Sequence, residues 1–196
     1  MLEMKFREII NKRHSIREYE NRKIPKKILK RLVITATKAP SAKNEQPWRF
    51  FIVSSKKRRD YLAEMLWEEF SKLRDIEKLT AKLDKIAIKF YKNIGNAQNL
   101  IFVFRETRKN PPAYQYFNDI AGVSGAIENL MLGAVEQGLG TCWIGTFKSK
   151  ENEIKKLLNT PRNYELLAAI AIGYPKKGSK PLIREKRKLS EVLKFI

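Results

Sequence analysis

Residues 13–17 of this chain read Arg-His-Ser-Ile-Arg, and residues 40–48 read Pro-Ser-Ala-Lys-Asn-Glu-Gln-Pro-Trp. The first stretch holds two guanidinium groups and a hydroxyl, a combination that suits a phosphate group. The second is a polar loop bounded by prolines that leads directly into an apolar strand. One predicted helix separates them, so a helical hairpin can return both stretches to the same region of the fold.

The composition is that of a soluble globular protein, with 43% hydrophobic and 32% charged residues. The 196 residues are enough for one sizeable core, and we expect a single domain over residues 1–196. No apolar run is long enough to span a bilayer, and residues 1–10 lack the apolar core of a signal peptide. We therefore expect a cytoplasmic protein with no membrane partner.

Cys142 and His14 are the only cysteine and histidine of the chain. Their scarcity excludes an internal disulfide framework. It also argues against a zinc site and against a Cys-His or Ser-His-Asp catalytic unit. We interpret Cys142 as a buried, inert thiol, and we expect no metal site. Any chemistry should then belong to a bound cofactor.

The formal net charge of +20 is large for a chain of this length. Such a surface attracts phosphate groups, so a nucleic-acid-binding module is one alternative for the function. The basic residues are, however, dispersed along the whole chain, and no known nucleic-acid-binding motif accompanies them. We favour the simpler interpretation that the charge keeps the protein soluble, with no specific nucleic-acid partner.

Hydrophobic periodicity predicts helices interleaved with strands. The expected helices cover residues 4–11, 25–39, 120–137 and 151–158, and the expected strands cover 48–53, 100–104, 140–145 and 166–172. Residues 56–93 are mostly helical by pattern, and residues 189–196 form a short element of uncertain type. The strand at 100–104 is apolar throughout, which indicates a central position with both faces covered. This order favours an α+β or α/β sheet with helices on both faces.

The two opening stretches resemble signatures of the nitroreductase family of FMN-dependent oxidoreductases. Further matches follow in the family's order: Glu128-Asn129-Leu130, Gly138-Leu139-Gly140, Trp143-Ile144-Gly145 and residues 171–175. The resemblance implies an α+β fold with a central, mostly antiparallel sheet flanked by helices, and an intertwined homodimer with FMN at the subunit interface. It does not extend over residues 56–95, so we interpret residues 55–95 as a variable helical cap.

The resemblance also implies which residues bind FMN. Arg13 and Ser15 would bind its phosphate with His14 alongside, and Arg17 would stabilise negative charge on the reduced ring. The edge of the flavin would be lined by residues of the partner subunit, namely Pro40, Ser41, Ala42 and Asn44. The ring system would lie beside Trp143, Ile144 and Gly145. A basic pair, Lys186 and Arg187, would complete the phosphate site. Ala42 replaces a serine that is common in the family.

The implied activity is a ping-pong transfer of hydride from NAD(P)H, through FMN, to a nitro compound, a quinone or a similar small acceptor. No catalytic side chain is required. The glycines after the long helix do not complete a dinucleotide-binding fingerprint, because Trp143 occupies the last glycine position, so NAD(P)H has no dedicated site. Flavin fragmentation and reductive dehalogenation in the same fold remain alternatives, for which the 55–95 region would supply the cap.

Overall fold

The computed structural model describes residues 5–72, 81–179 and 185–196. Its strands form one sheet in the order β1-β2-β4-β3, and each neighbouring pair is antiparallel. The strands are β1 (Trp48–Val53), β2 (Asn99–Glu106), β3 (Gly140–Ile144) and β4 (Tyr164–Gly173). The predicted antiparallel sheet and all of its predicted strands are therefore confirmed.

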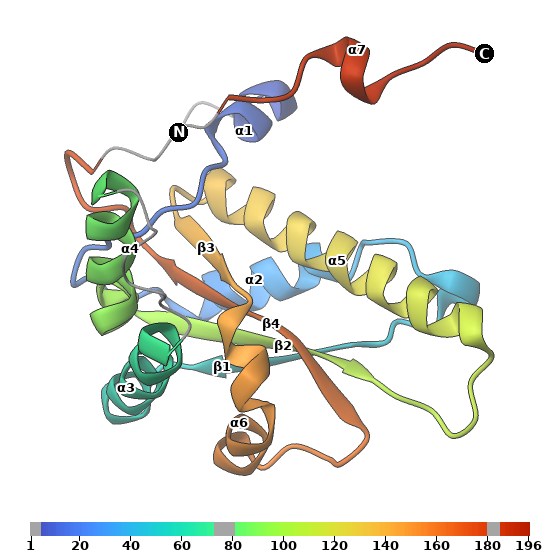
Figure 1. The fold of residues 1–196 in the computed structure, drawn as a ribbon, viewed down its shortest axis with the longest axis horizontal. Helices are drawn as coiled ribbons and strands as arrows, with labels where there is room; N and C mark the ends of the chain where they lie inside the picture. The colour runs from blue at the N-terminus through green and yellow to red at the C-terminus, as the bar shows by residue number, and fades with distance from the viewer. Residues whose placement is uncertain (1–4, 73–80, 180–184) are drawn as a thin grey trace.

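Helices cover both faces of this sheet (Figure 1). One face carries α2 (Lys26–Ala36) and the long α5 (Ala113–Glu136). The other face carries α3 (Lys56–Lys72), α4 (Ala81–Asn93) and α6 (Glu151–Leu158). Leu62 and Leu66 of α3 are fully buried against the sheet, so this helix belongs to the packed core of the chain.

A hydrophobic cluster lies on each face of the sheet, between the strands and the helices that cover them, and strand β2 contributes residues to both clusters. Leu100, Phe102 and Phe104 pack into the cluster under α3, α4 and α6. Ile101 and Val103 pack into the cluster under α2 and α5. Alternate residues of a strand point to opposite faces, so a strand that is apolar at every position must be covered on both. The predicted central position of this strand is confirmed.

Two boundaries near the carboxyl end of β2 differ from prediction. The strand continues through Arg105 and Glu106, beyond the predicted end at residue 104, and α5 begins at Ala113 rather than at Ile120. The first turns of α5 include Gln115 and Asp119, which are buried although they are polar. Buried polar residues break the apolar periodicity on which the prediction depended.

Small residues on α5 allow close packing within the chain. A Cβ on Gly122 would lie 3.2 Å from the carbonyl oxygen of Pro40, and one on Gly133 would lie 3.3 Å from Cγ2 of Thr35 in α2. This side of α5 therefore serves packing within the chain.

The first and last described segments of the chain are exposed. Helix α1 (Phe6–Lys12) buries none of its residues, and the short α7 (Leu189–Val192) projects away from the sheet at the C-terminal end (Figure 1). Every residue from 185 to 196 is exposed, and Phe195 retains 93% of its accessible surface. Among the described helices, none has the length and apolar character needed to cross a membrane.

Replacing Gly95 by alanine should lower stability sharply. Gly95 has φ +59°, and a Cβ there would overlap the carbonyl oxygen of Arg17. We expect G95A to lose about 3 kcal/mol of unfolding free energy or more, measured by urea denaturation. The matched control is G178A, which also has positive φ (+79°) but no atom within 4 Å of the new Cβ, and it should lose about 1 kcal/mol. Equal losses in the two variants would contradict the close approach at Gly95.

Cys142 should react slowly in the native protein. Burial raises the pKa of its thiol, and the charge of Arg17 offsets this only in part, so little thiolate is present at pH 8. We expect alkylation by iodoacetamide at pH 8 to be slower than in the guanidinium-unfolded chain by at least about a hundredfold, because reaction requires local opening. Since the chain has one cysteine, the alkylated fraction of the intact protein, measured by mass spectrometry, reports the reaction of Cys142. Equal rates would show that the thiol is accessible.

Candidate functional site

The stretch after α1 lies against the outer edge of β3. Ser15 forms a parallel bridge with Thr141, and the N–H of Ile16 donates to the carbonyl oxygen of Thr141 at 2.8 Å. Because Trp143 follows two positions along the same strand, the structure brings the 13–17 stretch close to the Trp143–Gly145 group. Both groups were singled out from the sequence.

A glycine permits this contact. A Cβ on Gly140 would lie 2.6 Å from Cγ1 of Ile16, so only glycine lets the 13–17 stretch approach β3 this closely. The sequence shows Gly140 as part of a turn signature, but it does not show which segment packs against it.

The side chains of the 13–17 stretch are half-buried. Arg13 Nε lies 3.2 Å from Glu128 Oε1 of α5, and Arg17 Nη1 donates to the carbonyl oxygen of Ser15 at 3.3 Å. The hydroxyl of Thr141 is buried and has no hydrogen-bond partner among the described residues. Guanidinium groups and a serine hydroxyl are therefore carried by the stretch that runs along this edge, which suits an oxygen-rich anion.

Trp143 and Ile144 end β3, and Gly145 follows them; the three residues lie in two different environments. Cys142 and Ile144 are buried, whereas Trp143 keeps 41% of its surface exposed. A Cβ on Gly145 would meet no atom within 4 Å. An exposed indole beside an open stretch of backbone can accommodate a flat aromatic group.

The 40–47 loop has a constrained conformation. It contains a 3₁₀ turn (Ala42–Asn44), and Lys43, Asn44 and Gln46 all have positive φ. The hydroxyl of Ser41 accepts a hydrogen bond from the N–H of Gln46 at 3.0 Å, which closes the loop. Ser41 and Ala42 are half-buried, while Pro40 and Asn44 are exposed.

Within one chain, the 40–47 loop and the 13–17 stretch contact different sides of α5. The loop packs at Gly122 and Arg13 pairs with Glu128. Six residues of α-helix separate these positions by about 9 Å along the axis and about 120° around it. No hydrogen bond or ion pair joins the loop to the stretch in residues 5–72, 81–179 and 185–196. One chain alone therefore does not unite all the predicted site residues.

Lys186 and Arg187 also stand apart from the 13–17 stretch. They are exposed and lie in the extended segment that leads to α7. In the part of the chain that the structure describes, neither has a hydrogen bond or ion pair with that stretch. Their predicted role in binding a phosphate stays a prediction.

Sequence reasoning missed several residues that organise this region. Glu128 and Glu45 were noted only as parts of motifs, and Thr141 was not noted. Glu45 in fact contacts Arg108 and Gln115. Each contact joins segments that are far apart in sequence, so spacing along the chain carries no signal for it.

Two curated relatives are similar to this chain. A protein of Archaeoglobus fulgidus, provisionally named NADH dehydrogenase/NAD(P)H nitroreductase, is 30% identical over 170 residues, which cover 86% of this chain and 84% of that protein. The iodotyrosine deiodinase 1 of Sus scrofa is 26% identical over 181 residues, covering 88% of this chain and 62% of that protein.

Three solved structures share the fold. A BluB-like flavoprotein from Clostridium difficile 630 superposes with a TM-score of 0.78 at 24% identity, covering 98% of this chain and 99% of that one. A nitroreductase family protein from Clostridium novyi NT has a TM-score of 0.70 at 29% identity, with 89% and 87% covered. A nitroreductase with bound FMN from Bacteroides fragilis NCTC 9343 has a TM-score of 0.75 at 24% identity, with 98% and 99% covered.

The sequence model of the nitroreductase family matches residues 10–174, which contain the 13–17 stretch, the 40–47 loop and the whole sheet. With the A. fulgidus relative at 30% identity over most of both chains, this match agrees with the motif order in the sequence and with the antiparallel sheet. The chain belongs to the nitroreductase family.

Proposed function

We propose that this chain forms a homodimeric, cytoplasmic FMN-dependent oxidoreductase that takes hydride from NADH or NADPH and reduces a small acceptor such as a nitro compound or a quinone. The observation that carries the proposal is the 13–17 stretch held against β3 beside Trp143, in a chain of the nitroreductase family. When bound, FMN supplies the redox chemistry that these side chains lack.

The residues along the edge of β3 fit the phosphate end of FMN. Arg13 offers planar paired donors, Ser15 offers a hydroxyl, and His14 lies between them. The pair between Arg13 and Glu128 is partly exposed, and such pairs contribute about 1 kcal/mol or less. A phosphate dianion can therefore compete with Glu128 for the guanidinium. Thr141, the residue that bridges to Ser15, has a buried hydroxyl with no hydrogen-bond partner among the described residues.

The remaining assignments complete the proposed site. Arg17 places a cation at the pyrimidine end of the ring, where it stabilises developing negative charge. Trp143, Ile144 and Gly145 border the ring, and the open backbone at Gly145 allows close approach. No side chain is assigned a proton-transfer role, because the reaction requires none.

The homodimer accounts for the separation of the loop from the stretch. Pro40, Ser41, Ala42 and Asn44 of one subunit would line the flavin edge of the other subunit's site. The segment 185–196, which carries Lys186 and Arg187, is exposed at every residue in the single chain and is available to a second copy.

Visible absorption of the purified protein tests the cofactor and the donor together. We expect flavin bands that bleach when NADH or NADPH is added without oxygen, and that return on addition of a simple quinone. The donor that bleaches the bands faster identifies the preferred nicotinamide. A colourless protein that also fails to take up added FMN would overturn the proposal.

Replacing Arg13 and Ser15 by alanine should abolish flavin retention, because both phosphate ligands are lost. The measurement is the flavin-to-protein absorbance ratio after gel filtration. R58A is the matched control, since Arg58 is an exposed arginine on α3 away from the edge of β3, and it should retain flavin as the wild type does. Full retention in the Arg13 and Ser15 variants would refute the site assignment.

Reductive dehalogenation is a second candidate, favoured by the similarity to iodotyrosine deiodinase 1 of Sus scrofa. It would require residues 55–95 to act as a cap over the substrate. Iodide release from 3-iodotyrosine under anaerobic reducing conditions, together with no turnover of quinones by NAD(P)H, would favour this candidate over the first.

A further inference from the structure

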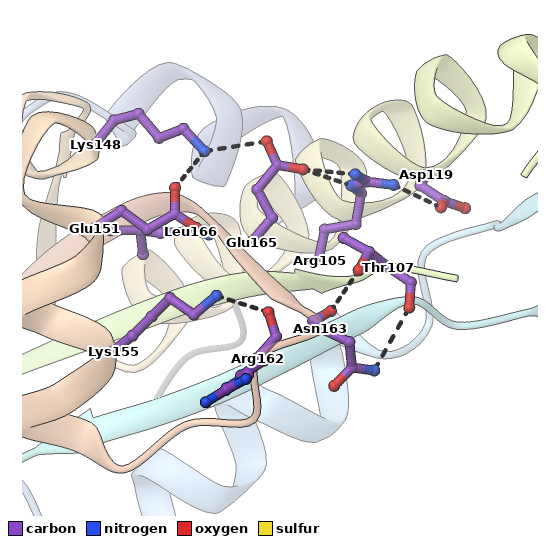
Figure 2. Close-up of polar contacts among 10 residues, drawn as sticks. All are labelled: Arg105, Thr107, Asp119, Lys148, Glu151, Lys155, Arg162, Asn163, Glu165 and Leu166. Atoms are coloured by element: carbon purple, nitrogen blue, oxygen red, sulfur yellow. Dashed lines mark hydrogen bonds and ion pairs between the residues drawn. The ribbon is translucent and has the colours of Figure 1, made fainter. Parts of the chain in front are cut away.

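A network of polar side chains lies behind the 40–47 loop, and the proposed function does not use it. Its buried centre is Arg105, at the end of β2. A register shift between β2 and β4 places Arg105 opposite Glu165. Arg105 donates to Oε2 of Glu165 from Nε at 3.1 Å and from Nη2 at 2.5 Å, and to Oδ2 of Asp119 from Nη1 at 3.3 Å, as Figure 2 shows. The side chains of Arg105 and Asp119 are only 7% and 3% exposed.

Gln115 connects this centre to the loop. Its side-chain nitrogen donates to Oδ1 of Asp119 at 2.7 Å and to Oε2 of Glu45 at 3.0 Å. A carboxamide nitrogen carries two hydrogens, so one goes to each carboxylate and none is left. Gln115 is 4% exposed, which makes it a buried link between the loop and α5.

Glu45 is the loop residue that receives this contact. It also forms an ion pair with Arg108, whose hydrogen bond lowers the pKa of the Glu45 carboxyl, so the carboxylate stays ionised near neutral pH. Glu45 lies between Asn44 and Gln46, which both have positive φ. Non-glycine residues keep such angles only where surrounding contacts hold them, and the anchored carboxylate provides such a contact.

We propose that Gln115 and Glu45 are positioning residues, which fix the 40–47 loop in the shape that receives the flavin edge and so set the affinity for FMN without contacting it. This inference rests on the proposed function, which assigns Pro40, Ser41, Ala42 and Asn44 to that edge. Without the link, the loop keeps its packing at Gly122 but loses its hydrogen bond to α5, and it relaxes toward ordinary backbone angles.

The test is the dissociation constant of FMN, measured by fluorescence quenching on flavin-free protein. We expect Q115L and E45L each to weaken FMN binding about tenfold, equivalent to about 1.4 kcal/mol. The absorption bands of the bound flavin should also lose their fine structure, because the ring edge becomes more accessible to water. The double variant should bind no more weakly than the weaker single variant, since both changes remove one connection.

A conservative variant and a control separate positioning from general stability. E45Q keeps an oxygen that accepts from Gln115, so it should bind within about threefold of the wild type. K155M removes a contact from Lys155 to the carbonyl oxygen of Arg162, which lies outside this network (Figure 2), so its FMN affinity should not change even if its melting temperature falls.

The outcomes are distinguishable. If the wild type binds FMN and loses it in the Arg13 variant, but Q115L and E45L keep wild-type affinity and spectrum, the positioning role is wrong and the proposed function stands. If the wild type takes up no FMN, both fail. If Q115L does not fold, R108L takes its place. Arg108 is 37% exposed and also holds Glu45, so R108L should weaken FMN binding, and unchanged affinity in it would likewise refute the role.

Discussion

From Leu100 to Phe104, strand β2 has no surface in contact with water, and this constrains the structure around it. Its alternating side chains need an apolar layer on each face, which α3, α4 and α6 supply on one side and α2 and α5 on the other. The chain is still inside the protein when it reaches Arg105, and a buried guanidinium is costly without counter-charges. Asp119 and Glu165 provide them, so the first turns of α5 must pack against this end of the sheet.

The sequence predicted best where local physics decides the structure. The bounds of β1 and α6 agree with prediction because apolar runs or helical periods are closed there by proline and polar residues. The predicted start of α5 was wrong because Gln115 and Asp119 are polar residues that interrupt the apolar periodicity of the helix. Only the folded chain shows that these polar groups are buried together, since their partners come from β2 and the 40–47 loop.

The candidate site likewise has features that the sequence predicts and features that only the folded chain shows. Ordered motifs identified the 13–17 stretch and the Trp143–Gly145 group, and the structure places the two along one strand. The pairing of Arg13 with Glu128 and the close approach at Gly140 could not be predicted, because they depend on which edge of the sheet the N-terminal segment follows. The basic pair at residues 186–187 belongs to an exposed segment with few contacts of its own, so its place in a site depends on contacts outside the single chain.

The exposed apolar side chains at the two ends of the chain have a thermodynamic consequence. Phe6 in α1 and Phe195 and Ile196 beyond α7 lie in water in a single subunit. If the homodimer proposed above covers them, folding and association become one linked equilibrium. The melting temperature of such a protein rises with its own concentration, and dilution shifts the equilibrium toward unfolded monomers. The amount of enzyme present would then set how much of it is folded, as well as how much is active.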